Sequence, residues 1–230
     1  MSSLFSPDSL FYRTMSRVAD LMLLNLCFLL TSIPIITIGA SSAALYTVCF
    51  RFDTEREAGT VKSYFDAFRA NFKQATCLWM IMLFVLVTAF FNAAFFYTLG
   101  GLFHLLWIIF AAVLVFAVFV VSYAFPLMSQ FENKNKQTFR NSLILSIAYL
   151  PRSIAMGVLN VLPIALALTQ LHVFLKCGFI WVMLYFGIAA YLNMKMLRKV
   201  FKPFYEKAQQ ESEGTDLELA ETTDSQEETL

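Results

Sequence analysis

Residues 32–46 read SIPIITIGASSAALY and follow directly on the apolar run VADLMLLNLCFLL of residues 18–30. From residue 18 to residue 50 the chain carries no charged side chain other than Asp20. One straight helix of that length would extend about 50 Å, whereas the hydrocarbon core of a bilayer is about 30 Å thick. The stretch therefore raises two questions: which solvent surrounds it, and where the surplus length goes.

Composition answers the first question. The chain of 230 residues is 59% hydrophobic and only 14% charged, whereas an average soluble domain is about 25% charged. A water-soluble fold of this size needs more polar surface than these residues supply, but a bilayer accepts apolar side chains on the outside of a protein. We therefore expect an integral membrane protein whose partner is the lipid bilayer. A nucleic acid partner is not expected.

The apolar runs predict an all-α, polytopic membrane bundle. A span needs about 20 mostly apolar residues, and five stretches qualify, at residues 18–37, 75–99, 102–127, 153–171 and 173–194. The links between the second and third spans and between the fourth and fifth are so short that each pair must form an antiparallel hairpin. The transmembrane domain is expected over residues 18–207, preceded by an N-terminal segment of residues 1–17.

Basic residues predict the orientation, because cytoplasmic loops carry an excess of Lys and Arg. With five spans, one side receives the loops 51–73 and 128–152 and the C-terminal tail, which together hold 14 basic residues, and the other side receives Arg13, Arg17 and Lys176. The C-terminus is therefore expected in the cytoplasm. Residues 208–230 are acidic and lack aromatic side chains, so this tail is expected to be disordered.

Both long loops carry an amphipathic helix pattern. In the first loop the apolar positions recur at helical spacing, at Val61, Phe65, Phe68 and Phe72. In the second loop the same spacing joins Phe139, Leu143, Ile147 and Leu150, and Pro151 then interrupts the helix. We expect two helices that lie in the cytoplasmic interface of the membrane.

The opening stretch is predicted to contain a break. Pro34 removes a backbone donor, the Thr37 hydroxyl is able to bond to a freed carbonyl, and Gly39 allows a conformation that other residues avoid. The small residues from Gly39 to Ala44 then form a face against which another helix packs closely. The expected result is a span, a break and a short helix that ends near Arg51. A re-entrant return is the alternative, and it would place Arg13 and Arg17 in the cytoplasm.

The sequence offers no known constellation for chemistry, so we expect no enzymatic activity, no cofactor and no metal. Four single cysteines fit small apolar positions better than metal or disulfide sites. Polar residues at membrane depth are costly unless they face protein or water. Four of them, together with the residues of the break, are the candidates for helix packing or for lining a substrate path: Asp20, Asn25, Pro34, Thr37, Gly39, Asn92 and Asn160.

Two segments carry a family resemblance. The stretches NLCFLLTSIPIITIGASSAALYTVCFRF and SYFDAFRANFKQAT resemble the YesL family, small multispanning proteins of mainly Gram-positive bacteria with a domain of unknown function. The resemblance implies a bacterial plasma membrane protein. It also implies an association with carbohydrate uptake or sensing, because family members are often encoded beside sugar transporters.

Two functional hypotheses follow. The first is a non-enzymatic accessory or scaffold protein that acts through helix packing and its interfacial helices on a membrane transporter or sensor, or on a second copy of itself. The alternative is a small transporter or channel with its site near the broken first helix, since transporters build sites from unwound backbone.

Overall fold

The computed structural model describes residues 10–52, 59–131 and 133–205, and every element in these ranges is helical. The whole acidic tail, residues 208–230, and the first nine residues of the N-terminal segment lie outside the described residues. The chain divides into two units after Met194. The helices and contacts described below belong to the first unit, except where helix 186–205 continues past that point.

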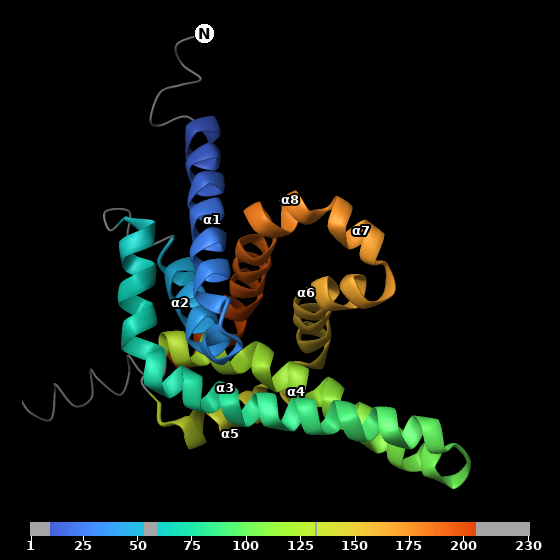
Figure 1. The fold of residues 1–230 in the computed structure, drawn as a ribbon. Coiled ribbons are helices and arrows are strands. Elements are labelled where there is room, and N and C mark those ends of the chain that lie inside the picture. The colour runs from blue at the N-terminus through green and yellow to red at the C-terminus, as the bar shows by residue number, and fades with distance from the viewer. Residues whose placement is uncertain (1–9, 53–58, 132, 206–230) are drawn as a thin grey trace, which may run out of the picture. The chain divides into compact units, whose positions relative to one another are not determined.

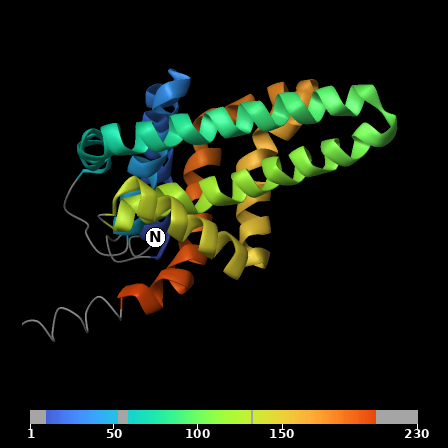
Figure 2. The same cartoon turned by 90° about the horizontal axis from the view of Figure 1, so that it is seen from below.

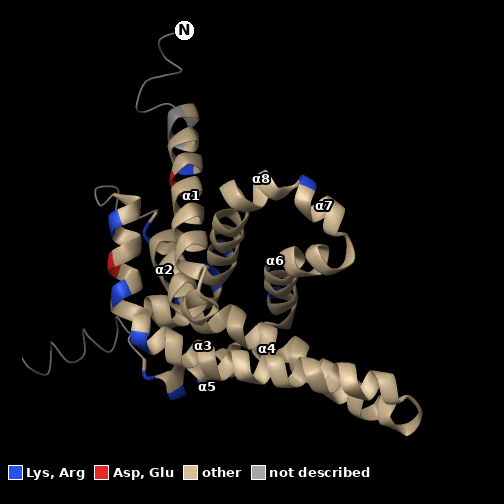
Figure 3. Cartoon of the chain, in the orientation of Figure 1, with Lys and Arg blue, Asp and Glu red and all other residues tan. Residues whose placement is uncertain are grey.

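Five helices are long and apolar enough to cross a membrane, as predicted: Thr14–Ser32, Thr60–Leu99, Gly101–Gln130, Leu150–Thr169 and Gly178–Tyr205. The ends of these helices differ from the ends of the predicted spans. Hydropathy marks only the apolar residues of a span, whereas the helices continue into the neighbouring polar sequence. The protein thus has the helices of a multi-pass membrane protein. Charged residues gather on a few of these elements, and the long hairpin of α3 (Thr60–Leu99) and α4 (His104–Gln130) shows none beyond its base (Figure 3).

The break in the opening stretch reverses the chain. Helix α1 (Leu10–Ser32) ends just before Pro34, the short 3-10 helix η1 (Ile35–Thr37) follows, and α2 (Ile38–Arg51) runs back beside α1 (Figure 1). The return is also visible in a hydrogen bond, since the hydroxyl of Thr60, beyond the end of α2, donates to Asp20 in the middle of α1 at 2.7 Å. The return geometry therefore describes residues 34–51, and a kinked single span does not.

The first interfacial helix and the second span form one continuous helix, α3 (Thr60–Leu99). Gly59 is its N-cap. Figure 1 shows that α3 changes direction along its length: its first part lies beside α2, and its second part leaves that pair and runs crosswise to α1. The sequence suggested a boundary near residue 75, but the helix bends without ending there.

The second part of α3 pairs with α4 (His104–Gln130) in an antiparallel hairpin (Figure 2). The chain turns at Gly100 and Gly101, which have φ values of 67° and 59°, a region that favours glycine. Aromatic rings hold the outer part together: Phe96 stacks on Phe110 with centroids 5.7 Å apart. The turn itself continues into the short 3-10 helix η2 (Gly101–Phe103).

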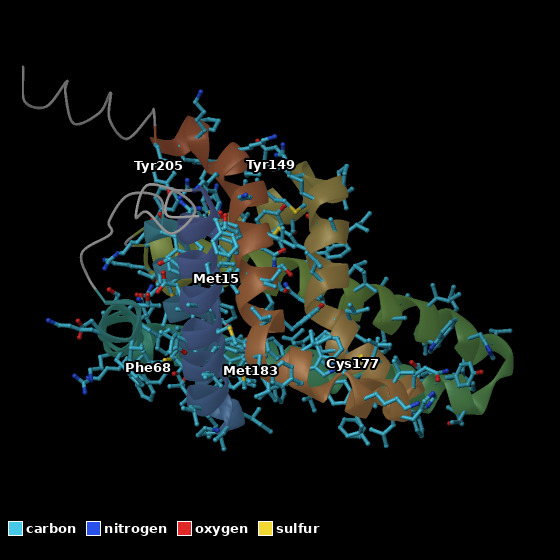
Figure 4. The ribbon with its side chains drawn as sticks, turned by 90° about the horizontal axis from the view of Figure 1, so that it is seen from above. Met15, Phe68, Tyr149, Cys177, Met183 and Tyr205 are labelled. Atoms are coloured by element: carbon cyan, nitrogen blue, oxygen red, sulfur yellow. The ribbon has the colours of Figure 1, made fainter. Side chains whose placement is uncertain are left out.

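The second interfacial helix is α5 (Asn135–Ala148), and it ends before Pro151 as predicted. Tyr149, labelled in Figure 4, separates it from α6 (Leu150–Thr169), in whose first turn the proline is tolerated. The Arg152 guanidinium lies 5.2 Å from the centroid of the Tyr149 ring.

The last predicted span is interrupted. Helices α7 (Leu171–Lys176) and α8 (Gly178–Ile180) precede a π-helix, η3 (Trp181–Tyr185), and the helix then continues over residues 186–205. The ring of Trp181 contacts Tyr185 edge to face at 4.5 Å and stacks on Phe174 at 5.5 Å. A π-helix frees backbone groups from the usual pattern, and these groups need other partners.

Candidate functional site

The break around Pro34 is closed by hydrogen bonds. The Thr37 hydroxyl donates to the carbonyl of Thr31 at 2.5 Å and to that of Pro34 at 2.8 Å, as the sequence led us to expect. From α3, the indole Nε1 of Trp79 donates to the carbonyl of Ile35 at 2.7 Å. The carbonyls of Thr31, Pro34 and Ile35 are thus bonded within the protein, whereas the buried hydroxyl of Ser32 has no hydrogen-bond partner among the described residues.

The small residues after the break allow close packing. A Cβ added at Gly39 would lie 2.5 Å from the Cβ of Trp79, 2.7 Å from the carbonyl oxygen of Ala75 and 3.0 Å from the ring of Phe125. No side chain fits there, because two of these neighbours belong to or adjoin the backbone. Gly39 and the alanines at positions 40, 43 and 44 are all buried. The predicted packing face therefore meets α3 and α4.

Tyr64 connects the break to the first part of α3. Its hydroxyl is hydrogen-bonded to the Thr31 hydroxyl at 2.6 Å and lies 3.4 Å from the carbonyl of Ser41, to which it donates. Tyr64 is fully buried. Together with the bond between Thr60 and Asp20, this contact fixes α3 against both arms of the α1–α2 hairpin.

Asn25 is fully buried and holds the π-helix. Its amide nitrogen donates to the carbonyls of Trp181 at 3.1 Å and Val182 at 2.6 Å, and its oxygen accepts from the backbone N–H of Gly187 at 2.9 Å. Gly187 permits this approach, since a Cβ there would lie 2.7 Å from the carbonyl oxygen of Leu21. Asn25 thus replaces backbone bonds that the π-helix lacks, and both of its amide protons are used.

A second buried network joins four helices. Asn193 donates to the Tyr46 hydroxyl at 3.0 Å and to the Asn160 side-chain oxygen at 3.2 Å. Asn160 in turn donates to the Ser122 hydroxyl at 2.8 Å, and Ser122 donates to a carbonyl of its own helix. The side-chain oxygen of Asn193 is buried and has no hydrogen-bond partner among the described residues.

Asn92 is separate from these groups. Its amide donates to the carbonyl of Thr88, one turn earlier on α3, at an exposed position. The seven candidate residues therefore do not meet in one site: Pro34, Thr37 and Gly39 form the break, and the four others lie elsewhere. Each of the four is bonded to a different partner set. Asp20, Asn25 and Asn160 bond to residues of other helices, whereas Asn92 bonds only within α3.

Sequence reasoning missed the aromatic partners. Tyr46, Tyr64 and Trp79 supply a hydroxyl or an indole N–H to the polar groups, yet in the sequence they look like ordinary apolar positions. Their polar tips are the one signal that could have identified them, since a buried Tyr or Trp usually finds a hydrogen-bond partner.

Metal ligands are not clustered in the described part of the chain, where no group of three or more His, Cys, Asp or Glu side chains comes together. All four cysteines are free thiols, and Cys27 and Cys49 are buried. Cys177 is half-buried and Cys77 is exposed.

Comparisons with known proteins point to one family. The model of the family described as "Protein of unknown function, DUF624" matches residues 21–93. The matched region covers the second part of α1, the break, α2 and most of α3, and the match agrees with the family resemblance seen in the sequence.

One curated relative shares more of the chain. Over 149 residues this chain is 28% identical to "Uncharacterized protein YteU" of Bacillus subtilis (strain 168), in an alignment that covers 63% of this chain and 66% of that protein. The alignment thus spans just under two thirds of that relative. No solved structure matches the chain. Neither printed name states an activity, so the function has to be argued from the geometry.

Proposed function

We propose that the protein is a non-enzymatic accessory or scaffold component of a bacterial plasma membrane that supports a transporter or sensor. One observation carries this proposal: the polar candidates at depth, Asn25 and Asn160 above all, are bonded within the protein. Interhelical bonds of this kind contribute about 0.6–2 kcal/mol each and fix the geometry of a helix assembly. Such an assembly presents surfaces to a partner rather than a site to a substrate.

The first interfacial helix supports the proposal. In the first part of α3, Ser63, Tyr64 and Ala67 are buried, while Phe65 and Phe72 remain exposed by 37% and 39%. Figure 4 looks nearly along this part of α3 and shows nitrogen-tipped side chains on its outer side. The side of the helix that carries these three buried residues therefore faces the protein. Its apolar stripe, including the half-buried Phe68, is available to lipid or to another protein.

The second interfacial helix repeats the pattern. On α5, Thr138, Ser142 and Ser146 are buried, whereas Phe139 and Ile147 are exposed. A water-soluble protein would show the reverse distribution, with the hydroxyl side chains outside. Both helices thus carry apolar stripes suited to the interface between membrane and cytoplasm.

We extend the proposal to the orientation. Since α2 returns beside α1, both ends of this hairpin lie on one side, and the two later hairpins keep that side for the C-terminus. Counted in this way, 16 of the 17 Lys and Arg residues of the sequence, all except Lys176, fall on one side, and this excess of positive charge supports a cytoplasmic location for that side. Tags at either end that report compartment should both show the cytoplasm. An extracytoplasmic N-terminus would contradict this orientation.

The carbohydrate role is the most specific part of the proposal, and the family resemblance is its support. A sugar transporter or a membrane sensor of sugars is therefore the partner to test first. The transporter alternative has no comparable support, because Asn25, Asn160 and the break are bonded internally and Asn92 lies apart from them.

Site-directed photocrosslinking tests the proposal. A photoreactive residue is introduced at Phe65 or Ile147 on the apolar stripes, and at Lys62 on the polar face of α3 as the matched control. We expect the two stripe positions to yield one protein adduct of defined stoichiometry, identified as a transporter or sensor subunit or as a second copy. Lipid adducts alone from a strictly monomeric protein would overturn the scaffold proposal.

A further inference from the structure

A cavity of about 1120 Å³ lies where the end of α2, the middle of α3, the end of α4 and the start of α5 come together. None of the candidate residues predicted from the sequence lines it. Its volume is at the upper end of the range for small-molecule sites. Three cationic side chains line it, Arg51, Lys73 and Lys134, against one acidic side chain, Asp66. The cavity therefore favours a ligand with negative charge.

The walls of this cavity are joined by side-chain bonds. The Gln74 amide donates to the carbonyl of Asn133, and the Asn135 amide donates to the carbonyl of Gln74 at 3.3 Å. These bonds hold α3 against the segment that leads into α5, directly beside Lys73 and Lys134 in the sequence. The two lysines thus extend from backbone that is tied together across the cavity.

One wall group lacks a partner. The side-chain oxygen of Asn135 is buried and has no hydrogen-bond partner among the described residues. A buried acceptor of this kind is costly unless something donates to it. A hydroxyl or ammonium group of a ligand would satisfy it, while the phosphate or carboxylate of the same ligand meets the lysines.

The cavity also lies where charge in the sequence stops. Residues 74–131 contain no Asp, Glu, Lys or Arg, and this uncharged hairpin is bounded in the sequence by Lys73 on one side and by Glu132 and Lys134 on the other. In a bilayer, side chains at such a boundary lie at the level of the lipid headgroups. Met128 and Phe131 add apolar surface to the lining. Basic pockets between membrane helices at this level commonly bind anionic headgroups.

We infer that this cavity binds a phosphate ester that carries hydroxyl groups, the chemistry of a phosphatidylglycerol headgroup. Lys73 and Lys134 contact the phosphate, and the oxygen of Asn135 accepts a bond from a headgroup hydroxyl. Glycerol phosphate in solution has the same chemistry, so the experiment has to separate the lipid from the soluble ester. The inference does not depend on the proposed scaffold role.

The test uses the full-length protein in nanodiscs of phosphatidylcholine with a minor fraction of phosphatidylglycerol, followed by native mass spectrometry of retained lipid. The double variant Lys73→Gln/Lys134→Gln should lower phosphatidylglycerol retention on the order of tenfold. Lys62→Gln/Lys136→Gln is the matched control: it removes the same charge from the same two helices, but neither residue lines the cavity. Retention in this control should stay at the level of the unchanged protein.

Soluble glycerol phosphate distinguishes the sources. If it binds saturably and displaces phosphatidylglycerol, the site takes the soluble ester; if phosphatidylglycerol is retained in its presence, the site is a lipid site. Either result supports the inference only if phosphatidylglycerol retention falls in Lys73→Gln/Lys134→Gln and not in the control variant. Equal loss of phosphatidylglycerol retention in both double variants would show a general attraction of the lipid to positive charge, without a specific site. Unchanged retention in both variants would show that the cavity does not bind the phosphate. Each of these outcomes overturns the inference.

Discussion

The two apolar hairpins of this protein turn by different means. At the α1–α2 turn, Thr37 and Trp79 bond to the backbone, and Gly39 packs against α3 without room for a Cβ. At the α3–α4 turn, Gly100 and Gly101 have positive φ, and a Cβ at either would meet nothing within 4 Å. The first turn is specified by tertiary contacts and the second by local backbone conformation.

The difference extends along both hairpins. Near the first turn, small residues of α2 are fully buried, whereas near the second turn large side chains such as Phe91 and Leu102 are exposed by 65% and 95%. In a bilayer, the apolar side chains exposed near the second turn contact lipid. Lipid keeps them away from water, so they do not need to pack against the rest of the protein. We therefore expect the first hairpin to respond strongly to substitutions that leave the second nearly unchanged.

The largest effect is expected at Gly39. Gly39→Ala forces the Cβ of residue 39 against Trp79 and the Ala75 carbonyl, which are unable to move aside cheaply, and overpacking of this kind costs roughly 3 kcal/mol or more. The free energy of unfolding, measured in mixed micelles with increasing dodecyl sulfate, gives the cost. Gly59→Ala is the control, since a Cβ there meets nothing. Equal stability of the two variants would contradict the close packing.

Asn25 and Asn92 form the next pair. Asn25→Leu leaves the carbonyls of Trp181 and Val182 and the N–H of Gly187 without their partner, which should cost about 2–3 kcal/mol. Asn92→Leu removes only a bond within α3 at an exposed position and should change stability by less than about 0.5 kcal/mol. The same unfolding assay compares them, and similar losses would show that Asn25 is not specific to the π-helix.

Gly100 should respond through conformation and not through space. With φ of 67° and ψ of −168°, it occupies a region that is nearly closed to other residues, so Gly100→Ala should cost about 1–2 kcal/mol. Because the strain is local, the cost should be unchanged in a protein that also carries Asn25→Leu. A double-mutant cycle measures this additivity, and strong coupling would show that the two hairpins are not independent.

The smallest effect is expected from the threonines at the two turns. Thr37→Val removes a hydroxyl that bonds two carbonyls at the break, at a cost of about 1 kcal/mol, which is typical of a capping group. Thr98→Val removes an exposed hydroxyl that bonds only the carbonyl of Phe95 near the second turn, and it should be close to neutral. A greater loss at Thr98 would reverse the comparison.

Much of the fold could be predicted from periodicity and length. The five apolar helices, the start of α3 after Gly59 and the stop before Pro151 follow from local chemistry. The continuity of α3 could not be predicted, since nothing local marks whether an amphipathic helix and a span are joined. The π-helix at Trp181 was also hidden, because it is stabilised by Asn25, 156 residues away in the sequence.

The candidate residues show the same division. The sequence identified Asn25, Asn160 and Thr37 as polar groups that need partners, because an unpaired polar group in lipid is costly. It could not identify the partners, which lie on other helices, and it gave no sign of the cavity beside Lys73 and Lys134, whose lining comes from four elements.

The sequence by itself determined that this protein belongs in a membrane, that it is helical and that the chain must break near Pro34, because surplus apolar length and a missing backbone donor are local facts. Only the tertiary structure decided that the break is a return. A bend and a reversal differ in what the following helix packs against. That choice depends on the contacts that Gly39, Tyr64 and Trp79 make where α1, α2 and α3 come together.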